Sequence, residues 1–368
     1  MERDPVQFLA YELEGHLDLV RTRLGDVLNA DSDDLALLPN ATTGVNTVLR
    51  SLDFQPGDEI LATDHDYNAC LNAIRFVSER TGARPVVAHI AFPPKTEDDV
   101  VAPILEAATS RTKLAVISHI TSPTALVLPI QRVVSELAAR GIDTLVDGAH
   151  AGMVATDLTT IGAAYYTGNL HKWFSSPKGA GFLHVRGDRQ EHVRPIVISH
   201  GTNSPRRERS RFRLEFDWVG TVDPTACLTF PAALDFFDAL LPGGWLEASR
   251  INRELVLAAR RTLQTGFPAE VGTPPESMIG SMASIDLPPD LPPPIPPVAA
   301  DAPPDTTWPE DALHAWLLNE QRIEVPVYAW PHTPTADVPR RRLLRISAQL
   351  YNDISQYERL ASVLSSLR

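Results

Sequence analysis

Two segments of the chain bring side chains capable of covalent chemistry to the ends of apolar runs. Residues 147–150 are Asp-Gly-Ala-His and directly follow Thr-Leu-Val at 144–146. Residues 169–173 are Asn-Leu-His-Lys-Trp and follow Tyr-Tyr-Thr at 165–167. A charged lysine among apolar and aromatic residues is costly, and a lowered pKa would make the amine of Lys172 a nucleophile toward an aldehyde. The spacing suggests a carboxylate and a reactive lysine at the ends of two strands.

A pyridoxal 5′-phosphate (PLP) site requires parts of this kind. A lysine carries the aldehyde as a Schiff base, a carboxylate keeps the pyridine nitrogen protonated, and N–H groups at a helix start bind the phosphate. Taken alone, Asp147 also fits a helix cap or a metal ligand, and Lys172 a partly exposed structural lysine. The rival nearby lysine is Lys178, in the turn Pro-Lys-Gly-Ala-Gly at 177–181, whose glycines permit close backbone approach.

The elements that must position these residues alternate between short apolar runs and helical patterns. Several runs are apolar throughout, which is typical of strands covered on both faces. The pattern predicts an α/β fold with a mostly parallel, seven-stranded sheet, and such sheets bind ligands at the carboxyl ends of their strands. The expected strands are 35–38, 59–63, 85–90, 114–120, 143–147, 163–167 and 181–185, and the expected helices between them are 43–52, 68–81, 98–108 and 130–139.

Three parts are expected along the chain: an N-terminal helix within 1–27 that packs on the small domain, a large domain at 28–242, and a smaller C-terminal α/β domain at 243–368. A long helix at 224–241 would close the large domain before Pro-Gly-Gly. The proline-rich segment 287–309 cannot be regular structure, so it is expected to be an exposed loop, or else a ligand for a partner. The small domain is expected to hold helices at 246–263, 310–322 and from 354, and strands at 279–287, 324–328 and 343–348.

Composition limits the classes of partner. The 368 residues carry a formal net charge of -13, which disfavours nucleic acid and acidic membrane surfaces as partners. The two basic runs, 206–213 and 340–345, are short and are expected to be surface loop, partner contact or anion site. Two widely spaced cysteines form neither a disulfide framework nor a metal cluster, and no apolar stretch is long enough for a membrane span or a signal peptide. A cytoplasmic location is therefore expected, with no metal.

The motifs Asp-Gly-Ala-His, His-Lys-Trp and Pro-Lys-Gly, in this order, resemble the class-V aminotransferase family of fold type I PLP enzymes, and most of all its isopenicillin N epimerase-like branch. The resemblance extends from Asn40 to the last helix. It implies a homodimer with a shared active site, in which Lys172 carries the cofactor, Asp147 faces the pyridine nitrogen and His150 approaches the ring hydroxyl. A helix-capping role is the alternative for His150.

Further positions match by the same resemblance. The turn Asn-Ala-Thr-Thr-Gly at 40–44 resembles the phosphate-binding turn, so Thr42 and Thr43 are candidate ligands. Tyr67, with His65 in reserve, matches the aromatic ring over PLP and the second acid that epimerisation would need; core packing is the alternative. Asn169 and His171 match contacts to the phosphate, and Thr221 matches a contact to the phosphate of the neighbouring subunit, with a simple helix start as its alternative. Ser122 or Thr121 is expected near the cofactor hydroxyl. Arg345 matches the residue that binds the substrate carboxylate.

Two departures from the family pattern bear on activity. Members of this branch carry an N-terminal stretch with an Asn-His-Gly-type turn, whereas this chain begins at the helix expected over 6–27. Residues 228–368 contain no cysteine, so persulfide chemistry of the desulfurase type is not expected. Epimerisation, β-elimination of a C–S bond and transamination share one set of residues, with the first two favoured by the resemblance. A non-catalytic relative is the second reading; a nucleotide-binding α/β protein would need a Gly-x-Gly-x-x-Gly segment that is missing after the first expected strand.

Overall fold

The computed structural model describes residues 1–266, 273–288, 291, 311–331 and 340–367. These residues divide into two compact units. The large unit comprises Met1–His89, Val101–Ile120 and Pro129–Glu247, and the small unit comprises Ile90–Val100, Thr121–Leu128 and the chain from Ala248. The division after Glu247 lies close to the expected boundary at 242. The two inserted segments of the small unit were not anticipated, because they are short loops that follow strands of the large unit.

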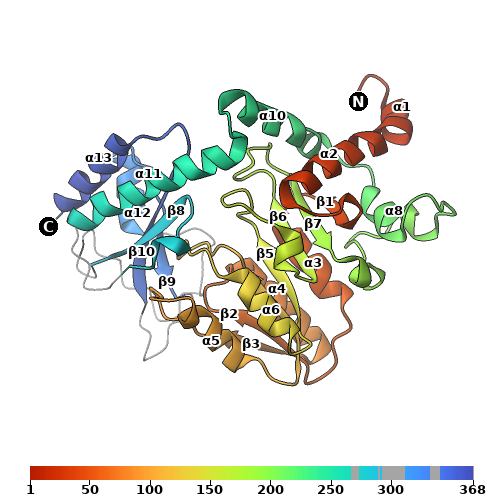
Figure 1. The fold of residues 1–368 in the computed structure, drawn as a ribbon, viewed down its shortest axis with the longest axis horizontal. Helices are drawn as coiled ribbons and strands as arrows, with labels where there is room; N and C mark the ends of the chain where they lie inside the picture. The colour runs from red at the N-terminus through yellow and green to blue at the C-terminus, as the bar shows by residue number, and fades with distance from the viewer. Residues whose placement is uncertain (267–272, 289–290, 292–310, 332–339, 368) are drawn as a thin grey trace. The chain divides into compact units, whose positions relative to one another are not determined.

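A seven-stranded, mostly parallel sheet forms the centre of the large unit, as predicted (Figure 1). Its strand order is β1-β7-β6-β5-β4-β2-β3, and only β7 runs antiparallel to both of its neighbours. Strands β2, β6 and β7 are buried at every position because helices cover both faces, whereas the edge strand β3 is mostly exposed and contains a proline, which an edge tolerates. The strands are β1 (Leu35–Leu38), β2 (Glu59–Thr63), β3 (Arg84–Ala88), β4 (Thr112–Ser118), β5 (Asp143–Gly148), β6 (Tyr165–Asn169) and β7 (Gly181–Val185).

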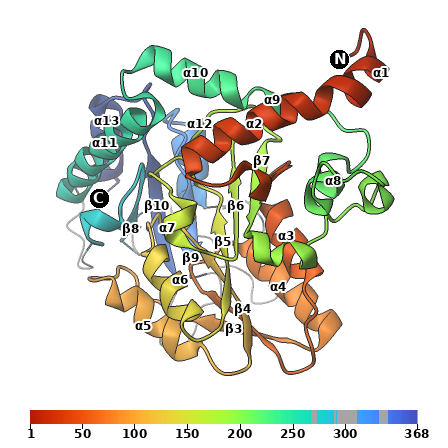
Figure 2. The ribbon, with the colours of Figure 1, turned by 45° about the vertical axis from the view of Figure 1, so that its right-hand side comes forward.

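Helices pack on the two faces of this sheet. In Figure 2 α3 and α4 lie on one face and α6 and α7 on the other. The helix expected over 224–241 is broken in two at Thr229, because Pro231 lacks the N–H that a continuous helix would need. The helices are α3 (Ala41–Ser51), α4 (Asn68–Thr81), α5 (Asp98–Ala107), α6 (Ile130–Ala138), α7 (Leu158–Ile161), α8 (Arg211–Asp217), α9 (Thr225–Leu228) and α10 (Phe230–Leu240).

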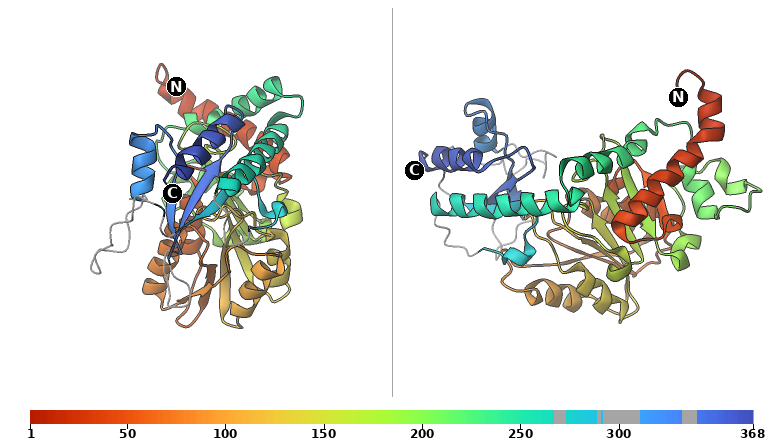
Figure 3. Two further views of the ribbon diagram at one scale, coloured as in Figure 1. Left: turned by 90° about the vertical axis from the view of Figure 1, so that its left-hand side faces the viewer. Right: turned by 45° about the horizontal axis from the view of Figure 1, so that its top comes forward.

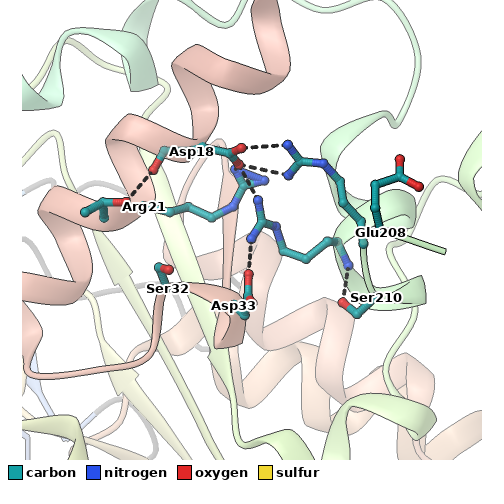
Figure 4. A pocket seen from close by; sticks show the side chains of 9 residues that line it. Asp18, Arg21, Ser32, Asp33, Glu208 and Ser210 are labelled. Carbon is teal, nitrogen blue, oxygen red and sulfur yellow. Dashed lines mark hydrogen bonds and ion pairs between the residues drawn. The ribbon is translucent and has the colours of Figure 1, made fainter. Parts of the chain in front are cut away.

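The N-terminal helix belongs to the large unit. It runs as α1 (Pro5–Gln7), a π-helical segment (Phe8–Glu12) and α2 (Leu13–Leu28), and α2 packs on β1, α9 and α10 of the large unit. Ion pairs join α2 to the basic run at 206–213. Asp18, labelled in Figure 4, binds both Arg209 and Arg213. The buried Arg21 pairs with the nearly buried Asp217. The basic run is therefore an intramolecular contact, around a charged hollow of about 410 Å³.

The small unit contains a three-stranded antiparallel sheet, ordered β8-β10-β9. Figure 3 shows α11 and α13 side by side, and leucines, alanines and valines of both helices share one apolar core with the strands. Most of the proline-rich segment 287–309 lies outside the described residues. The elements are α11 (Gly244–Gly266), β8 (Met282–Leu287), α12 (Ala312–Asn319), β9 (Val327–Trp330), β10 (Arg341–Ser347) and α13 (Ile354–Ser365).

The described residues contain no single membrane-spanning helix and no cluster of metal ligands. No single helix there combines the length and apolar composition needed to cross a membrane, although a bent pair, Thr225–Leu240 with Gly244–Thr265, meets these two criteria. In the same part of the chain, no three His, Cys, Asp or Glu side chains are grouped as metal ligands would be.

Candidate active site

The carboxyl ends of the parallel strands bring the two central candidate residues together. Ser118 at the end of β4 is in register with Asp147 of β5, and Asp147 is in register with Thr167 of β6. Lys172 follows β6 in the loop that leads into β7. The sheet therefore presents the carboxylate and the amine at one edge, where open α/β sheets bind their ligands.

Two donors hold the carboxylate of Asp147, which is 5% exposed. Its Oδ1 accepts a hydrogen bond from the Ala149 N–H at 3.0 Å, and its Oδ2 accepts one from the Cys70 thiol at 3.1 Å. Burial, followed by the charge of Asp147, raises the pKa of Cys70 well above its usual value, so the thiol keeps its proton and remains a donor. No local pattern marks Cys70 as part of the site, because its contact with Asp147 joins residues that are far apart in sequence.

A three-residue contact links Lys172 to its surroundings. Its Nζ lies 3.4 Å from Nε2 of the buried His150, and the indole N–H of Trp173 donates to Nδ1 of the same ring at 3.0 Å. The Lys172 side chain is exposed, contrary to the expectation of an apolar environment. Its contact with His150 is therefore made at a solvent-accessible position.

The start of α3 forms a group of hydrogen-bond donors beside these residues. The Asn40 side chain caps the helix by accepting from the Thr43 N–H at 2.9 Å and from the Thr43 hydroxyl at 3.1 Å. Thr42 and Thr43 are half-buried. A Cβ on Gly44 would lie 2.1 Å from Oγ1 of Thr167, so only glycine allows the helix to approach β6 so closely. A helix start with hydroxyls is a suitable site for a phosphate.

Asn169 and His171 are tied to the protein itself. The amide of Asn169 accepts from the Ala41 N–H at 2.8 Å and donates to the Ala149 carbonyl at 3.2 Å, so it positions the helix start. His171 donates through Nδ1 to the Ala180 carbonyl at 2.7 Å, and burial lowers its pKa. A hydrogen bond from this imidazole to a phosphate would therefore have to come from Nε2, in the protonated ring or after a change of tautomer.

The turn after β2 carries the expected aromatic residue. Asp66 is buried and accepts from the Thr63 N–H and the Ser118 N–H, each at 2.6 Å, which joins the ends of β2 and β4. Burial raises the pKa of Asp66 to about 6. Tyr67 is 46% exposed, whereas His65 is completely buried. Of the two candidates for the aromatic position, Tyr67 alone has a side chain that is accessible in the isolated chain.

The substrate-carboxylate candidate lies in the small unit. Arg345 donates through Nη1 to the Ser122 carbonyl at 2.6 Å and to the Ser122 hydroxyl at 3.0 Å, and its guanidinium lies over the Tyr328 ring at 5.0 Å. Ser122, expected near the cofactor hydroxyl, thus contacts Arg345, and Thr121 bonds to Thr124 and to the Leu126 N–H. Within the described residues Nε of Arg345 is buried without a hydrogen-bond partner. Ser122 therefore occupies Nη1 of the guanidinium, while Nε remains an unused donor.

Thr221 lies apart from these groups in sequence, on an exposed turn between α8 and α9. The preceding Gly220 has φ +109°, a conformation that favours glycine.

Comparisons with known proteins identify the family and the fold. A family model described as "Aminotransferase class-V" matches residues 6–268. Isopenicillin N epimerase of Streptomyces clavuligerus is 33% identical over 99% of this chain and 87% of its own, and putative L-cysteine desulfhydrase 1 of Oryza sativa subsp. japonica is 30% identical over 99% and 77%. Among solved structures, the cystine C–S lyase C-DES in complex with cysteine persulfide has a TM-score of 0.75 at 22% identity, covering 96% of this chain and 87% of that one.

Proposed function

We propose that this chain, which belongs to the class-V aminotransferase family and is a PLP-dependent enzyme, removes the α-proton of an amino acid and completes either an epimerisation or a β-elimination of a C–S bond. The observation that carries the proposal is the placement of Asp147 and Lys172 at the ends of neighbouring strands, with His150 in contact with the lysine. The epimerases and cysteine desulfhydrases among its relatives support these two outcomes.

The residues present fit the cofactor. Asp147 offers a carboxylate that is held by two hydrogen-bond donors. The start of α3 offers hydroxyls and backbone N–H groups, and Gly44 allows this helix to lie close to β6. Asp147 would hold the pyridine proton, Thr42 and Thr43 the phosphate, and Lys172 the aldehyde. When bound, PLP takes up the electron pair that the α-carbon retains after losing its proton.

The chain's own groups then divide the remaining work. Lys172, once released, is the base that accepts the α-proton. Arg345 binds the substrate carboxylate with the donors that Ser122 leaves available. Tyr67 is the acid that epimerisation would need on the opposite face, and its exposed phenol supports this assignment. For β-elimination no second acid at the α-carbon is required, so Tyr67→Phe separates the two outcomes.

The experiment is an absorbance spectrum of the purified protein with PLP, for wild type, Lys172→Ala and Lys178→Ala. We expect the visible Schiff-base band in wild type and in Lys178→Ala, and its loss in Lys172→Ala. A screen of L- and D-amino acids and cysteine conjugates then identifies the reaction from its product: the other enantiomer, pyruvate with a released thiol or sulfide, or a keto acid for transamination. A band that persists in Lys172→Ala, or a wild type that forms none, would refute the proposal, and binding without any product would indicate a non-catalytic relative.

The shared-site homodimer and the cytoplasmic location are further parts of the proposal. The exposure of Thr221 and of the adjacent apolar Val222 supports an interface at the turn 220–221. Sedimentation velocity should then give a dimer. Thr221→Asp would place a negative charge near the partner's phosphate site and weaken PLP binding, whereas a monomer with full PLP affinity would contradict the shared site.

A further inference from the structure

The hydrogen bond from Trp173 determines which nitrogen of His150 carries the proton. An indole N–H can only donate, so Nδ1 of His150, 3.0 Å away, must be an unprotonated acceptor. A neutral imidazole has one protonated nitrogen, which must then be Nε2. A protonated imidazolium would direct an N–H from Nδ1 against the indole N–H, so the same contact keeps His150 neutral.

The tautomer matters because Nε2 is the nitrogen that lies next to Lys172. The distance from Nε2 to Nζ is 3.4 Å. With its proton on Nε2, the imidazole donates, and a lysine can accept only as the uncharged amine. An ammonium at Lys172 could donate a hydrogen bond to His150 only if Nε2 were unprotonated, and that requires the Nδ1–H tautomer which Trp173 opposes. The arrangement thus disfavours the ammonium form without burying the lysine.

The loop after β6 fixes this geometry. The Ser175 N–H bonds to the Lys172 carbonyl at 3.2 Å and the Ser176 N–H to the Leu170 carbonyl at 3.0 Å, which closes a tight turn around Trp173. The next residue, Phe174, is fully buried with its ring 5.1 Å from that of Trp245. Lys172 and Trp173, although adjacent in sequence, are therefore both held against the one imidazole.

We propose that Trp173 is a positioning residue that keeps His150 as the neutral Nε2–H tautomer and thereby favours the nucleophilic amine of Lys172. The effect of Trp173 on cofactor loading rests on the proposed function, whereas its effect on the tautomer of His150 does not. Loss of one hydrogen bond of ordinary net strength predicts that Trp173→Phe slows Schiff-base formation with PLP at neutral pH by about five-fold, and that the pH dependence of this rate shifts upward.

The first measurement is ¹⁵N NMR of the imidazole-labelled protein without cofactor, with the His150 signals assigned by their loss in His150→Gln. We expect the Nε2–H tautomer in wild type and in the control Trp245→Phe, and a mixture that includes Nδ1–H or the imidazolium in Trp173→Phe. A wild-type His150 protonated on Nδ1 would overturn the proposal, whether or not the variant folds.

The second measurement is the rate of formation of the visible band with PLP across pH, for the same three proteins. A Trp173→Phe rate profile that coincides with those of wild type and Trp245→Phe would overturn the proposed influence on Lys172. If wild type itself formed no band, the proposed function would fail, while the NMR result would still decide the tautomer.

Discussion

At the residue scale, Cys70 is a buried thiol whose hydrogen bond to Asp147 has a measurable consequence. Replacing it with Val fills the same space but removes one of the two donors to a buried carboxylate. We expect Cys70→Val to lower the free energy of unfolding by about 1–3 kcal/mol, as for other buried groups left unsatisfied. Cys70→Ser keeps a donor to the carboxylate and should retain most of the wild-type stability.

The control is Cys227→Val. That thiol is also buried, but its nearest acceptors are backbone carbonyls at 3.9 and 4.0 Å. Urea unfolding of the cofactor-free protein measures all three variants. Equal losses for the two valine substitutions would show that packing, and not the carboxylate, accounts for the effect.

Arg345 supports a prediction about substrate binding. Lysine at this position could not hold Ser122 and present two donors to a carboxylate at the same time. Arg345→Lys should lower kcat/KM for the amino-acid substrate by about 10- to 100-fold while leaving the cofactor band in place. Ser122→Ala removes only one acceptor for Arg345 and should lower kcat/KM by a smaller factor. Loss of the cofactor band in Arg345→Lys would instead indicate a role in PLP binding.

At the element scale, the ion pairs between α2 and α8 determine where the N-terminal helix lies. Arg21 is 1% exposed and pairs with Asp217, so Arg21→Leu would leave a buried carboxylate with weaker compensation. We expect a loss of about 3–5 kcal/mol in the free energy of unfolding. Arg23→Leu, two residues away, removes the exposed pair with Asp235 and should cost about 1 kcal/mol or less. Chemical denaturation distinguishes them; similar losses would contradict a dominant role for the buried pair.

The same ion pairs show where sequence reasoning stops. Strands 35–38, 59–63 and 181–185 were predicted at their observed bounds, because burial on both faces leaves a continuous apolar run. Asp18 and Arg213, in contrast, are far apart in sequence and no local pattern joins them, so the packing of α2 against α8 cannot be predicted from the sequence.

In the candidate site, spacing and resemblance marked Asp147, His150 and Lys172. The contributions of Cys70 and Trp173 depend on distances across the fold, and the exposure of Lys172 could not be read from its apolar sequence neighbours.

At the scale of the whole molecule, buried histidines make stability depend on pH. His119 is 6% exposed beside Tyr166, and burial lowers its pKa from 6.5 to about 4. Above pH 6.5 the imidazole is neutral in both the folded and the unfolded state. Between pH 6.5 and 4 only the unfolded state is protonated, so stability is lost as the pH falls, by roughly 3 kcal/mol from this residue.

His119→Gln should therefore lose less stability than wild type between pH 7 and 4, whatever its stability at pH 7. Urea unfolding at intervals of pH measures the difference. The control is the exposed His192→Gln, whose stability should follow the wild-type dependence on pH. A His119→Gln curve parallel to wild type would assign the acid sensitivity to other groups.

The reversed direction of β7 has a consequence for turnover. Because β7 pairs with β6, with Asn169 opposite Gly181, residues 170–180 form a loop anchored at both ends in one sheet. If Lys172, which lies in this loop, carries the cofactor aldehyde as proposed, it can be released from the aldehyde and still cannot diffuse away from it. The effective concentration of its amine near the aldehyde would then stay in the range of intramolecular reactions, so its release would be readily reversed at the end of each catalytic cycle.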